Sequence, residues 1–267
     1  MYSITAALSL SYTGSYDRVK GETPVKKNHK YIDFLAKLAI DNAHPGGRRL
    51  TEGIINRASI KPGDSILDVG CGTGATSALL AEKIHADVTG IDFHPGMVKR
   101  AKKRSMESGL SFKVLQASAE ELPFEDHTFD WVLSESVTAF TDSSRSVPEY
   151  LRVLRPGGKL IAVEMTLEKS LPLSDTEGIQ NLYGVQRLYT ENDWKAVLER
   201  AGFTSVKALK ESDIVLHSNQ SPLPVFHLTS EIDDETFEIW LTHLQVMQNY
   251  KDVLSYRIYL AAKPLDS

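Results

Sequence analysis

The chain has 267 residues, a formal net charge of −5 and a single cysteine. This length predicts one large domain with a small appended cap and enough residues to bury a core of its own. Lys and Arg are scattered along a net acidic chain, which argues against a nucleic-acid partner. Because Cys71 is the one cysteine, neither a disulfide framework nor a multi-cysteine metal site is available, and no metal is expected.

The first residues carry no recognisable targeting signal. Residues 1–16 lack the basic start and apolar run of a signal peptide, and no run of about 18 apolar residues could span a membrane. We therefore expect a cytoplasmic protein without stable membrane insertion. Pro24 can open a helix with Tyr31, Phe34 and Leu38 at helical spacing. This helix is expected either to pack against the sheet edge or to close over a ligand as a lid.

A glycine-rich loop follows the first predicted strand, 65–69. Gly70, Gly72 and Gly74 stand at alternate positions before a helical pattern. Glycine permits a tight turn and lets a ligand approach the backbone without a Cβ in the way. The N-terminus of the next helix directs N–H groups toward whatever lies over the loop. Asp92, 18 positions after Gly74 and at the end of the second strand, can accept both hydroxyls of a ribose. Loop and acid together indicate a site for a nucleoside-containing cofactor.

The glycine loop alone leaves the cofactor open. Gly70-x-Gly72-x-x-Ala75 also fits the dinucleotide-binding fingerprint, in which alanine can replace the third glycine. An NAD(P)-dependent oxidoreductase is therefore an alternative. The tyrosine–lysine pair or similar hydride-transfer residues expected near the fourth strand are not apparent.

Strand and helix patterns alternate between residues 65 and 164. The expected strands are 65–69, 87–91, 112–115, 129–134 and 159–164, and the expected helices are 75–85, 95–108 and one that begins at a Ser146-x-x-Glu149 capping box. Such alternation predicts a parallel sheet with helices on both faces. Ligands of such sheets bind beyond the carboxyl ends of the strands.

The alternation stops after Glu164. Residues 165–186 are polar and are predicted to be irregular, and residues 212–231 are predicted to form an insertion. Between them, a Thr190-x-x-Asp193 capping pattern starts a helix, and a strand at 204–209 follows it. A long helix from Asp233 to about Tyr250 carries one apolar stripe, made of Phe237, Leu241, Leu244 and Met247. A final strand is expected at 255–261.

The whole chain, 1–267, is predicted to be one domain. Its expected segments are an N-terminal lid at 1–43, a cofactor-binding core at 44–164, a substrate-side insertion with helices at 165–250, and the final strand at 251–267.

Three downstream motifs decide between the cofactors. They are Ala117-Ser118-Ala119-Glu120-Glu121-Leu122-Pro123-Phe124, then Phe129-Asp130-Trp131-Val132-Leu133, then Leu151-Arg152-Val153-Leu154-Arg155-Pro156-Gly157-Gly158-Lys159-Leu160. Together with the glycine loop, their order and spacing resemble the class I S-adenosylmethionine-dependent methyltransferases, and within them the small-molecule branch of ubiquinone and menaquinone biosynthesis enzymes. The resemblance implies an α/β fold: a Rossmann-like three-layer sandwich with a seven-stranded, mostly parallel sheet and an antiparallel last strand. An N-terminal lid helix and a helical cap insertion complete the expected fold.

The resemblance also implies roles for residues of the loop and the strand ends. Gly70 and Gly72 would lie against the methionine portion of the cofactor, with Gly74 and Cys71 in the same loop. Cys71 itself is expected to be a small apolar filler. Asp68 would meet the cofactor ammonium, and Asp92 the ribose hydroxyls.

The adenine side is implied by the next set of residues. Phe93 would lie against the adenine ring, and Met97 belongs to the same cofactor-binding set. Ala119 would donate its backbone N–H to an adenine nitrogen. Ser118 stands where many members have aspartate, so binding there is expected to depend on the backbone and on Glu120.

The implied reaction moves a methyl group from S-adenosylmethionine to a small-molecule acceptor at nitrogen, oxygen or carbon and releases S-adenosylhomocysteine. Glu135, Glu164 and Tyr16 are the candidates for contact with the acceptor, and Glu135 is also a candidate for the cofactor ammonium. A non-catalytic methyltransferase-like binding module stays open beside the oxidoreductase alternative. The sequence reveals neither the acceptor nor the oligomeric state.

Overall fold

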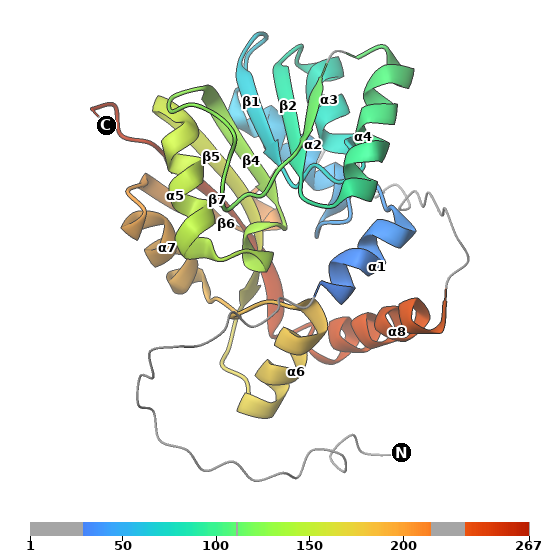
Figure 1. Cartoon of the computed structure of the whole chain (residues 1–267). Coiled ribbons are helices and arrows are strands. Elements are labelled where there is room, and N and C mark those ends of the chain that lie inside the picture. Colours follow the sequence, from blue (N-terminus) through green and yellow to red (C-terminus); the bar gives the residue numbers. More distant parts are fainter. Residues whose placement is uncertain (1–28, 111, 215–232, 267) are drawn as a thin grey trace, which may run out of the picture.

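A seven-stranded sheet lies at the centre of the fold, with helices on both of its faces (Figure 1). The computed structural model describes residues 29–110, 112–214 and 233–266. The strands stand in the order β3-β2-β1-β4-β5-β7-β6. Their bounds are β1 Ser65–Val69, β2 Asp87–Asp92, β3 Lys113–Gln116, β4 Phe129–Glu135, β5 Leu154–Leu167, β6 Thr204–Leu209 and β7 Leu254–Ala262.

Strands β1 to β5 pair in parallel, and β7 enters antiparallel between β5 and β6. The strand order reverses at β1, which has β2 and β3 on one side and β4 and β5 on the other. In such sheets the crevice beyond the carboxyl ends at the reversal point is where ligands bind. The prediction of a mostly parallel sheet with an antiparallel last strand is confirmed.

Two apolar cores cover the two faces of the sheet. Helices α2 (Gly47–Ala58), α3 (Ala75–Lys83) and α4 (Pro95–Ser108) pack on the face that carries Ile66. Helices α5 (Ser143–Val153) and α7 (Glu191–Arg200) pack on the face that carries Leu67. These neighbouring residues of β1 enter opposite cores because successive side chains of a strand point to opposite faces. The predicted three-layer arrangement is confirmed.

Three further helices form a cap beyond the carboxyl ends of the parallel strands. They are α1 (Lys30–Leu38), α6 (Leu173–Tyr183) and α8 (Asp234–Asn249), and each contacts the other two. Figure 1 shows them below the sheet, on the side where β5 ends and α6 begins. The prediction of irregular chain at 165–186 is therefore wrong. Buried Ile179 and Tyr183 stabilise α6 through contacts with distant segments, which the local polarity of the sequence does not reveal.

Helix α5 begins earlier than its predicted capping box. Its N-cap is Asp142, whose side chain accepts a hydrogen bond from the backbone N–H of Ser144, so the predicted start at Ser146 is wrong. Glu149 does not close a box with Ser146. Because Asp142 caps the helix, the carboxylate of Glu149 is not needed for a capping box. It accepts a hydrogen bond from the N–H of Leu122, 27 positions away.

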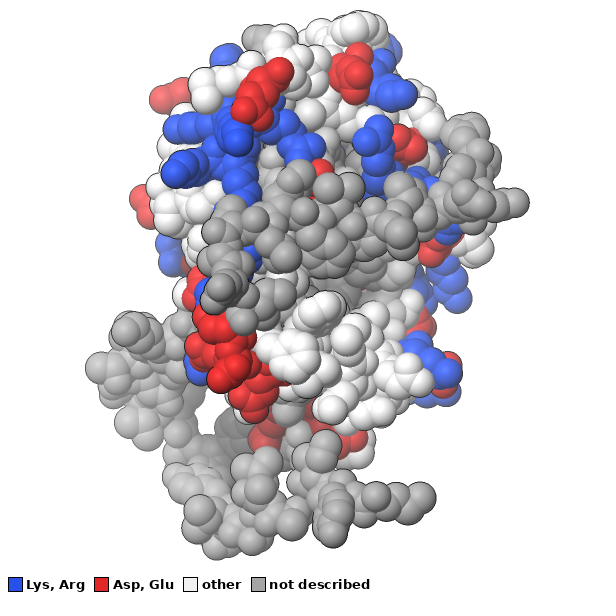
Figure 2. All heavy atoms as spheres, turned by 90° about the vertical axis from the view of Figure 1, so that its right-hand side faces the viewer, with Lys and Arg blue, Asp and Glu red and all other residues white. Residues whose placement is uncertain are grey.

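Helix α8 presents an apolar row to the outside. Phe237, Leu241, Leu244 and Met247, the predicted stripe, are each 45–50% exposed. Figure 2 views this side of the molecule and shows an uncharged area beside a group of acidic side chains, with basic side chains above. Within the described ranges, no helix is long and apolar enough to cross a membrane.

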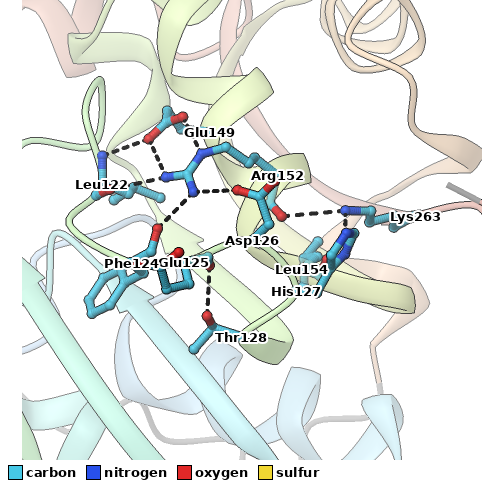
Figure 3. A network of polar contacts seen from close by, with 10 residues as sticks. All are labelled: Leu122, Phe124, Glu125, Asp126, His127, Thr128, Glu149, Arg152, Leu154 and Lys263. Atoms are coloured by element: carbon cyan, nitrogen blue, oxygen red, sulfur yellow. Dashed lines mark hydrogen bonds and ion pairs between the residues drawn. The ribbon is translucent and has the colours of Figure 1, made fainter.

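Arg152 at the end of α5 secures the turn between β3 and β4 (Figure 3). Its guanidinium donates to the carbonyl oxygens of Leu122 at 3.0 Å and Phe124 at 2.7 Å. It also pairs with the carboxylates of Glu149 at 2.7 Å and Asp126 at 2.8 Å. These charge-assisted bonds hold a segment that has little secondary structure of its own.

Replacing Arg152 with alanine should lower the free energy of unfolding by about 2–3 kcal/mol, because two carbonyls and two carboxylates lose a charged donor together. Arg155→Ala is the matched control, since Arg155 forms one exposed ion pair with Asp130. That control should cost about 1 kcal/mol or less. Urea unfolding of the unaltered protein and the two variants measures these free energies. Equal losses of stability in both variants would contradict the role given to Arg152.

Candidate functional site

The candidate site lies at the carboxyl ends of β1, β2 and β4, around the loop from Gly70 to Gly74. The loop is closed by its own backbone: the N–H of Cys71 donates to the carbonyl of Ile91, and the N–H of Gly74 donates to the carbonyl of Cys71, both at 2.8 Å. These bonds hold the loop against β2 and start α3 at Ala75. The site therefore stands at the point where the strand order reverses.

The glycines of the loop differ in what surrounds them. A Cβ at Gly70 would lie 2.4 Å from Cγ2 of Val137, so this position is closed by the protein itself. A Cβ at Gly72 would meet no described heavy atom within 4 Å, although φ there is +56°. Gly72 is therefore the position at which a ligand can reach the loop backbone.

Asp68 is buried near the end of β1 and accepts a hydrogen bond from Oγ of Ser77 at 2.5 Å. Burial, together with the nearby charges of Glu135 and Asp92, raises the pKa of the Asp68 carboxyl to about 7. The Ser77 hydroxyl opposes this shift only in part. Asp68 is thus a carboxylate that a neighbouring cation would favour in its ionised form.

Asp92 ends β2 with both carboxylate oxygens turned toward backbone donors. Oδ2 accepts from the N–H of Gly72 at 3.0 Å, and Oδ1 accepts from the N–H of His94 at 2.8 Å. Burial raises the pKa of Asp92, and these two bonds oppose the shift. Because each carboxylate oxygen has two lone pairs, each can still accept a hydroxyl of a ligand.

Glu135 ends β4 and points to the loop side of the site. Its buried carboxylate accepts from the hydroxyl of Thr51 on α2 at 2.7 Å and from that of Thr76 on α3 at 2.8 Å. Nε2 of His44 lies 3.5 Å from the same carboxylate. Glu135 therefore ties two helices to the sheet beside Asp68.

These three carboxylates form a buried acidic group, defined as Asp68, Asp92 and Glu135. In the described part of the chain, no Lys or Arg lies within ion-pair distance of any of them. Buried charges are costly unless they are paired, so the group is suited to a ligand that carries positive charge.

The residues predicted on the adenine side lie in three different settings. Phe93 is 44% exposed, and its ring is 5.3 Å from that of His29, whereas Met97 and Ala119 are buried. The hydroxyl of Ser118 accepts from the N–H of Glu120 at 3.1 Å and so caps its own turn.

Glu120 is turned toward the start of α5. Its carboxylate accepts from the N–H of Asp142 at 2.9 Å and pairs with Arg145 at 3.3 Å. Both contacts belong to the helix start rather than to the glycine loop.

Glu164 lies apart from the buried acidic group, behind the short helix η2 (Thr138–Phe140). It is buried in β5 and accepts from the N–H groups of Thr138 at 3.0 Å and Ala139 at 3.2 Å. Burial raises the pKa of its carboxyl to about 7. Its oxygens hold the chain that follows β4. Tyr16 lies outside the described residues.

One anchoring residue, Asp41, was not predicted. Its carboxylate accepts a hydrogen bond from the hydroxyl of Thr73 at 2.5 Å. Nη2 of Arg104 donates to both oxygens of the same carboxylate, at 2.6 and 2.8 Å. The segment after α1 is thereby fastened to the glycine loop and to α4. No local pattern marks Asp41, because its partners are 32 and 63 positions away.

Comparisons with known proteins show the family of this chain. A methyltransferase domain family matches residues 67–162. The uncharacterized methyltransferase YodH of Bacillus subtilis (strain 168) is 35% identical over 234 residues, which cover 88% of this chain and 99% of that protein. Methyltransferase GfsG of Streptomyces halstedii is 31% identical over 195 residues, 70% of each chain.

Solved structures agree on the fold. The structure of Haemonchus contortus phosphoethanolamine N-methyltransferase 2 with phosphomonomethylethanolamine and S-adenosylhomocysteine has a TM-score of 0.66 at 20% identity, over 84% of this chain and 55% of that one. With the family match and the near full-length relative, the chain belongs to the class I S-adenosylmethionine-dependent methyltransferases.

Gly72→Ala should weaken binding of S-adenosylhomocysteine by about 1–3 kcal/mol, because the added methyl occupies space that the fold leaves open to a ligand. Gly109→Ala is the matched control, since Gly109 also has open surroundings and a positive φ of +66°. Both variants should lose about 1 kcal/mol of folding stability from backbone strain. Titration calorimetry measures the binding, and unchanged affinity in Gly72→Ala would contradict the assignment.

The affinity for S-adenosylhomocysteine should rise with pH through about 7. Burial raises the pKa of Asp68 to about 7, and a ligand ammonium beside it would bind the ionised form, so affinity at pH 6 should be roughly tenfold below that at pH 7.5. The same shift makes the free fold less stable as pH rises from about 4 to 7, because the folded chain keeps a proton that the unfolded chain has released. Asp68→Asn should flatten the binding profile; a slope that survives this change assigns it to another group.

Proposed function

We propose that this protein transfers a methyl group from S-adenosylmethionine to a small-molecule acceptor and releases S-adenosylhomocysteine. The observation that supports this most strongly is the buried acidic group beside the open backbone of Gly72. Bound S-adenosylmethionine supplies an activated methyl on a sulfonium cation. A donor with positive charge, an ammonium and a ribose matches acidic side chains that have no Lys or Arg partner in the described ranges.

The carboxylates divide the recognition of the donor between them. Asp68 and Glu135 bind the ammonium, since they stand near the ends of the neighbouring strands β1 and β4. Hydroxyl donors already fix the orientation of each carboxylate. Asp92 accepts the ribose hydroxyls while the N–H groups of Gly72 and His94 hold it in place. Charge-assisted hydrogen bonds of this kind are the strong ones.

The adenine is placed beside Phe93, whose exposed ring is free to stack on a base. The buried residues Met97 and Ala119 form the floor under it. Ser118 and Glu120 support this side indirectly, because their polar atoms hold the turn and the start of α5.

The rest of the protein orients the acceptor and excludes water. An activated donor needs its acceptor held in line, and a closed site prevents hydrolysis. The cap of α1, α6 and α8 closes the carboxyl end of the sheet, and Asp41 fastens α1 to the glycine loop. Glu164 contributes by holding η2 in position rather than by contact with the acceptor.

Three ligands distinguish this function from its alternatives. Calorimetry with S-adenosylmethionine, S-adenosylhomocysteine and NADH should give binding of the first two and none of the third. Binding of NADH alone would instead support a dinucleotide site. If the donor binds, a screen of small-molecule acceptors with methyl-labelled donor separates an enzyme from a binding module, which would transfer no label.

Asp92→Ala should cost about 2–4 kcal/mol of donor binding, since two hydrogen bonds to a charged acceptor are lost. Asp87→Ala is the control, because Asp87 begins the same strand on the exposed surface, 4.0 Å from Lys113. Calorimetry on both variants tests this, with thermal unfolding to confirm that each is folded. Equal affinities would remove Asp92 from the site.

A further inference from the structure

A chain of hydrogen bonds joins His44 to Glu135 through one threonine. His44 lies in the turn before α2, and its Nε2 is 3.1 Å from Oγ1 of Thr51 on that helix. The hydroxyl of Thr51 is in turn 2.7 Å from Oε1 of Glu135. On the other side of the ring, Nδ1 of His44 lies 3.0 Å from the carbonyl oxygen of Pro45. The chain is buried throughout, since the side chains of His44 and Glu135 are 5% and 7% exposed and Thr51 is 1% exposed.

An ionised Glu135 and a neutral His44 together have too few protons for these contacts. A threonine hydroxyl carries one proton, and a neutral imidazole carries one. If Thr51 donates to the carboxylate, the ring has to donate from Nε2 to Thr51 and from Nδ1 to the carbonyl oxygen of Pro45, which only accepts. A neutral ring can do one of these, so the other contact would bring two lone pairs together.

Two arrangements of the protons satisfy every contact. In the first, Glu135 is a carboxylate, Thr51 donates to it, and His44 is an imidazolium that donates from both nitrogens. In the second, Glu135 is a neutral acid that donates to Thr51, Thr51 donates to Nε2 of His44, and the ring keeps its proton on Nδ1. The total charge is the same in both. They differ in which end of the chain holds one proton.

The other oxygen of Glu135 is bonded in the same way in both arrangements. Nδ2 of Asn42 donates to Oγ1 of Thr76 at 3.2 Å, so the one proton of Thr76 is directed to Oε2 of Glu135 at 2.8 Å. A carboxylate and a neutral carboxylic acid can both accept this bond. Oε1, which faces Thr51, is therefore the oxygen that gains or loses the proton.

The neighbouring carboxylates favour a different arrangement in the free and the bound protein. The charge of Glu135 contributes to the raised pKa of Asp68, so a neutral Glu135 relieves repulsion within the buried acidic group. A ligand ammonium beside Glu135 reverses this preference, because a buried cation is stable only when it is paired. The site therefore gains from a carboxyl group that is neutral without a ligand and ionised with one.

We propose that His44 is a positioning residue that exchanges one proton with Glu135 through Thr51 when the donor binds. The O–H bond at Oε1 of Glu135 breaks as its proton passes to Oγ1 of Thr51, and the hydroxyl proton of Thr51 passes to Nε2 of His44. Glu135 becomes the carboxylate that the ammonium requires, and no proton leaves the buried site. This inference rests on the proposed function, because it concerns how the same site receives the donor ammonium.

Nitrogen NMR of the histidine rings detects this exchange directly. The protein is isotope-labelled in its histidine nitrogens, and the signals of His44 are identified by their loss in His44→Gln. In the free protein, Nε2 of His44 should give the signal of an unprotonated ring nitrogen. Saturation with S-adenosylhomocysteine should replace it with the signal of a protonated one. 5′-Methylthioadenosine has the same nucleoside but no ammonium, and it should leave the signals of His44 unchanged.

Variants of Thr51 test whether the proton travels through its hydroxyl. Thr51→Ser keeps the hydroxyl and should keep the change at His44. Thr51→Val removes it at similar volume, so it should abolish that change and weaken S-adenosylhomocysteine about tenfold, with 5′-methylthioadenosine unaffected. The matched control is Thr166→Val, since Thr166 is also 1% exposed and its hydroxyl contacts Tyr259 on β7. Thermal unfolding confirms each fold. If Thr51→Val does not fold, the comparison of the two ligands on the unaltered protein still decides.

The contrary outcomes are equally definite. The same protonation state of His44 with and without S-adenosylhomocysteine would overturn the exchange. A change at His44 that survives Thr51→Val, or that 5′-methylthioadenosine also produces, would do the same. The proposed function stands in each of these cases, because S-adenosylhomocysteine is bound. Failure of S-adenosylhomocysteine to bind would instead count against the proposed function and would overturn the exchange with it.

Discussion

The burial of three carboxylates at one edge of the sheet is the constraint around which this fold is arranged. Asp68, Asp92 and Glu135 each need donors where water is excluded. Those donors come from α2, α3 and the glycine loop, through hydroxyls and backbone N–H groups. Because these donors are neutral, they satisfy the carboxylate oxygens without supplying a counter-charge. The same hydrogen bonds to the buried carboxylates thus fix the shape of the glycine loop and keep the site acidic.

The cap depends on this edge in a second way. Asp41 accepts hydrogen bonds from Thr73 in the glycine loop and from Arg104 on α4, so the segment after α1 cannot move without breaking a charge-assisted contact with the loop. Helices α6 and α8 then pack on α1. Closure of the cap and order in the glycine loop are therefore linked through one carboxylate.

Much of the fold could be predicted from the sequence, because short local motifs and the periodic spacing of apolar residues mark strand β1, the glycine loop and Asp92. The Thr190–Asp193 capping box was predicted for the same reason and is present. The start of α5 and the existence of α6 were not, since Glu149 bonds across 27 positions and α6 is held by distant apolar contacts. The contact between Tyr31 on α1 and His243 on α8 has no local signal at all, because the two residues are 212 positions apart.

That wide spacing affects how the protein could be rebuilt. The cap helices α6 and α8 supply no hydrogen bond to Asp68, Asp92 or Glu135 within the described residues. Those carboxylates draw their donors from α2, α3 and the glycine loop. A chimera that exchanges α6 or α8 with another sequence would leave these hydrogen-bond donors in place. The sequence of these two cap helices can therefore vary without a matching change at the edge that carries the three carboxylates.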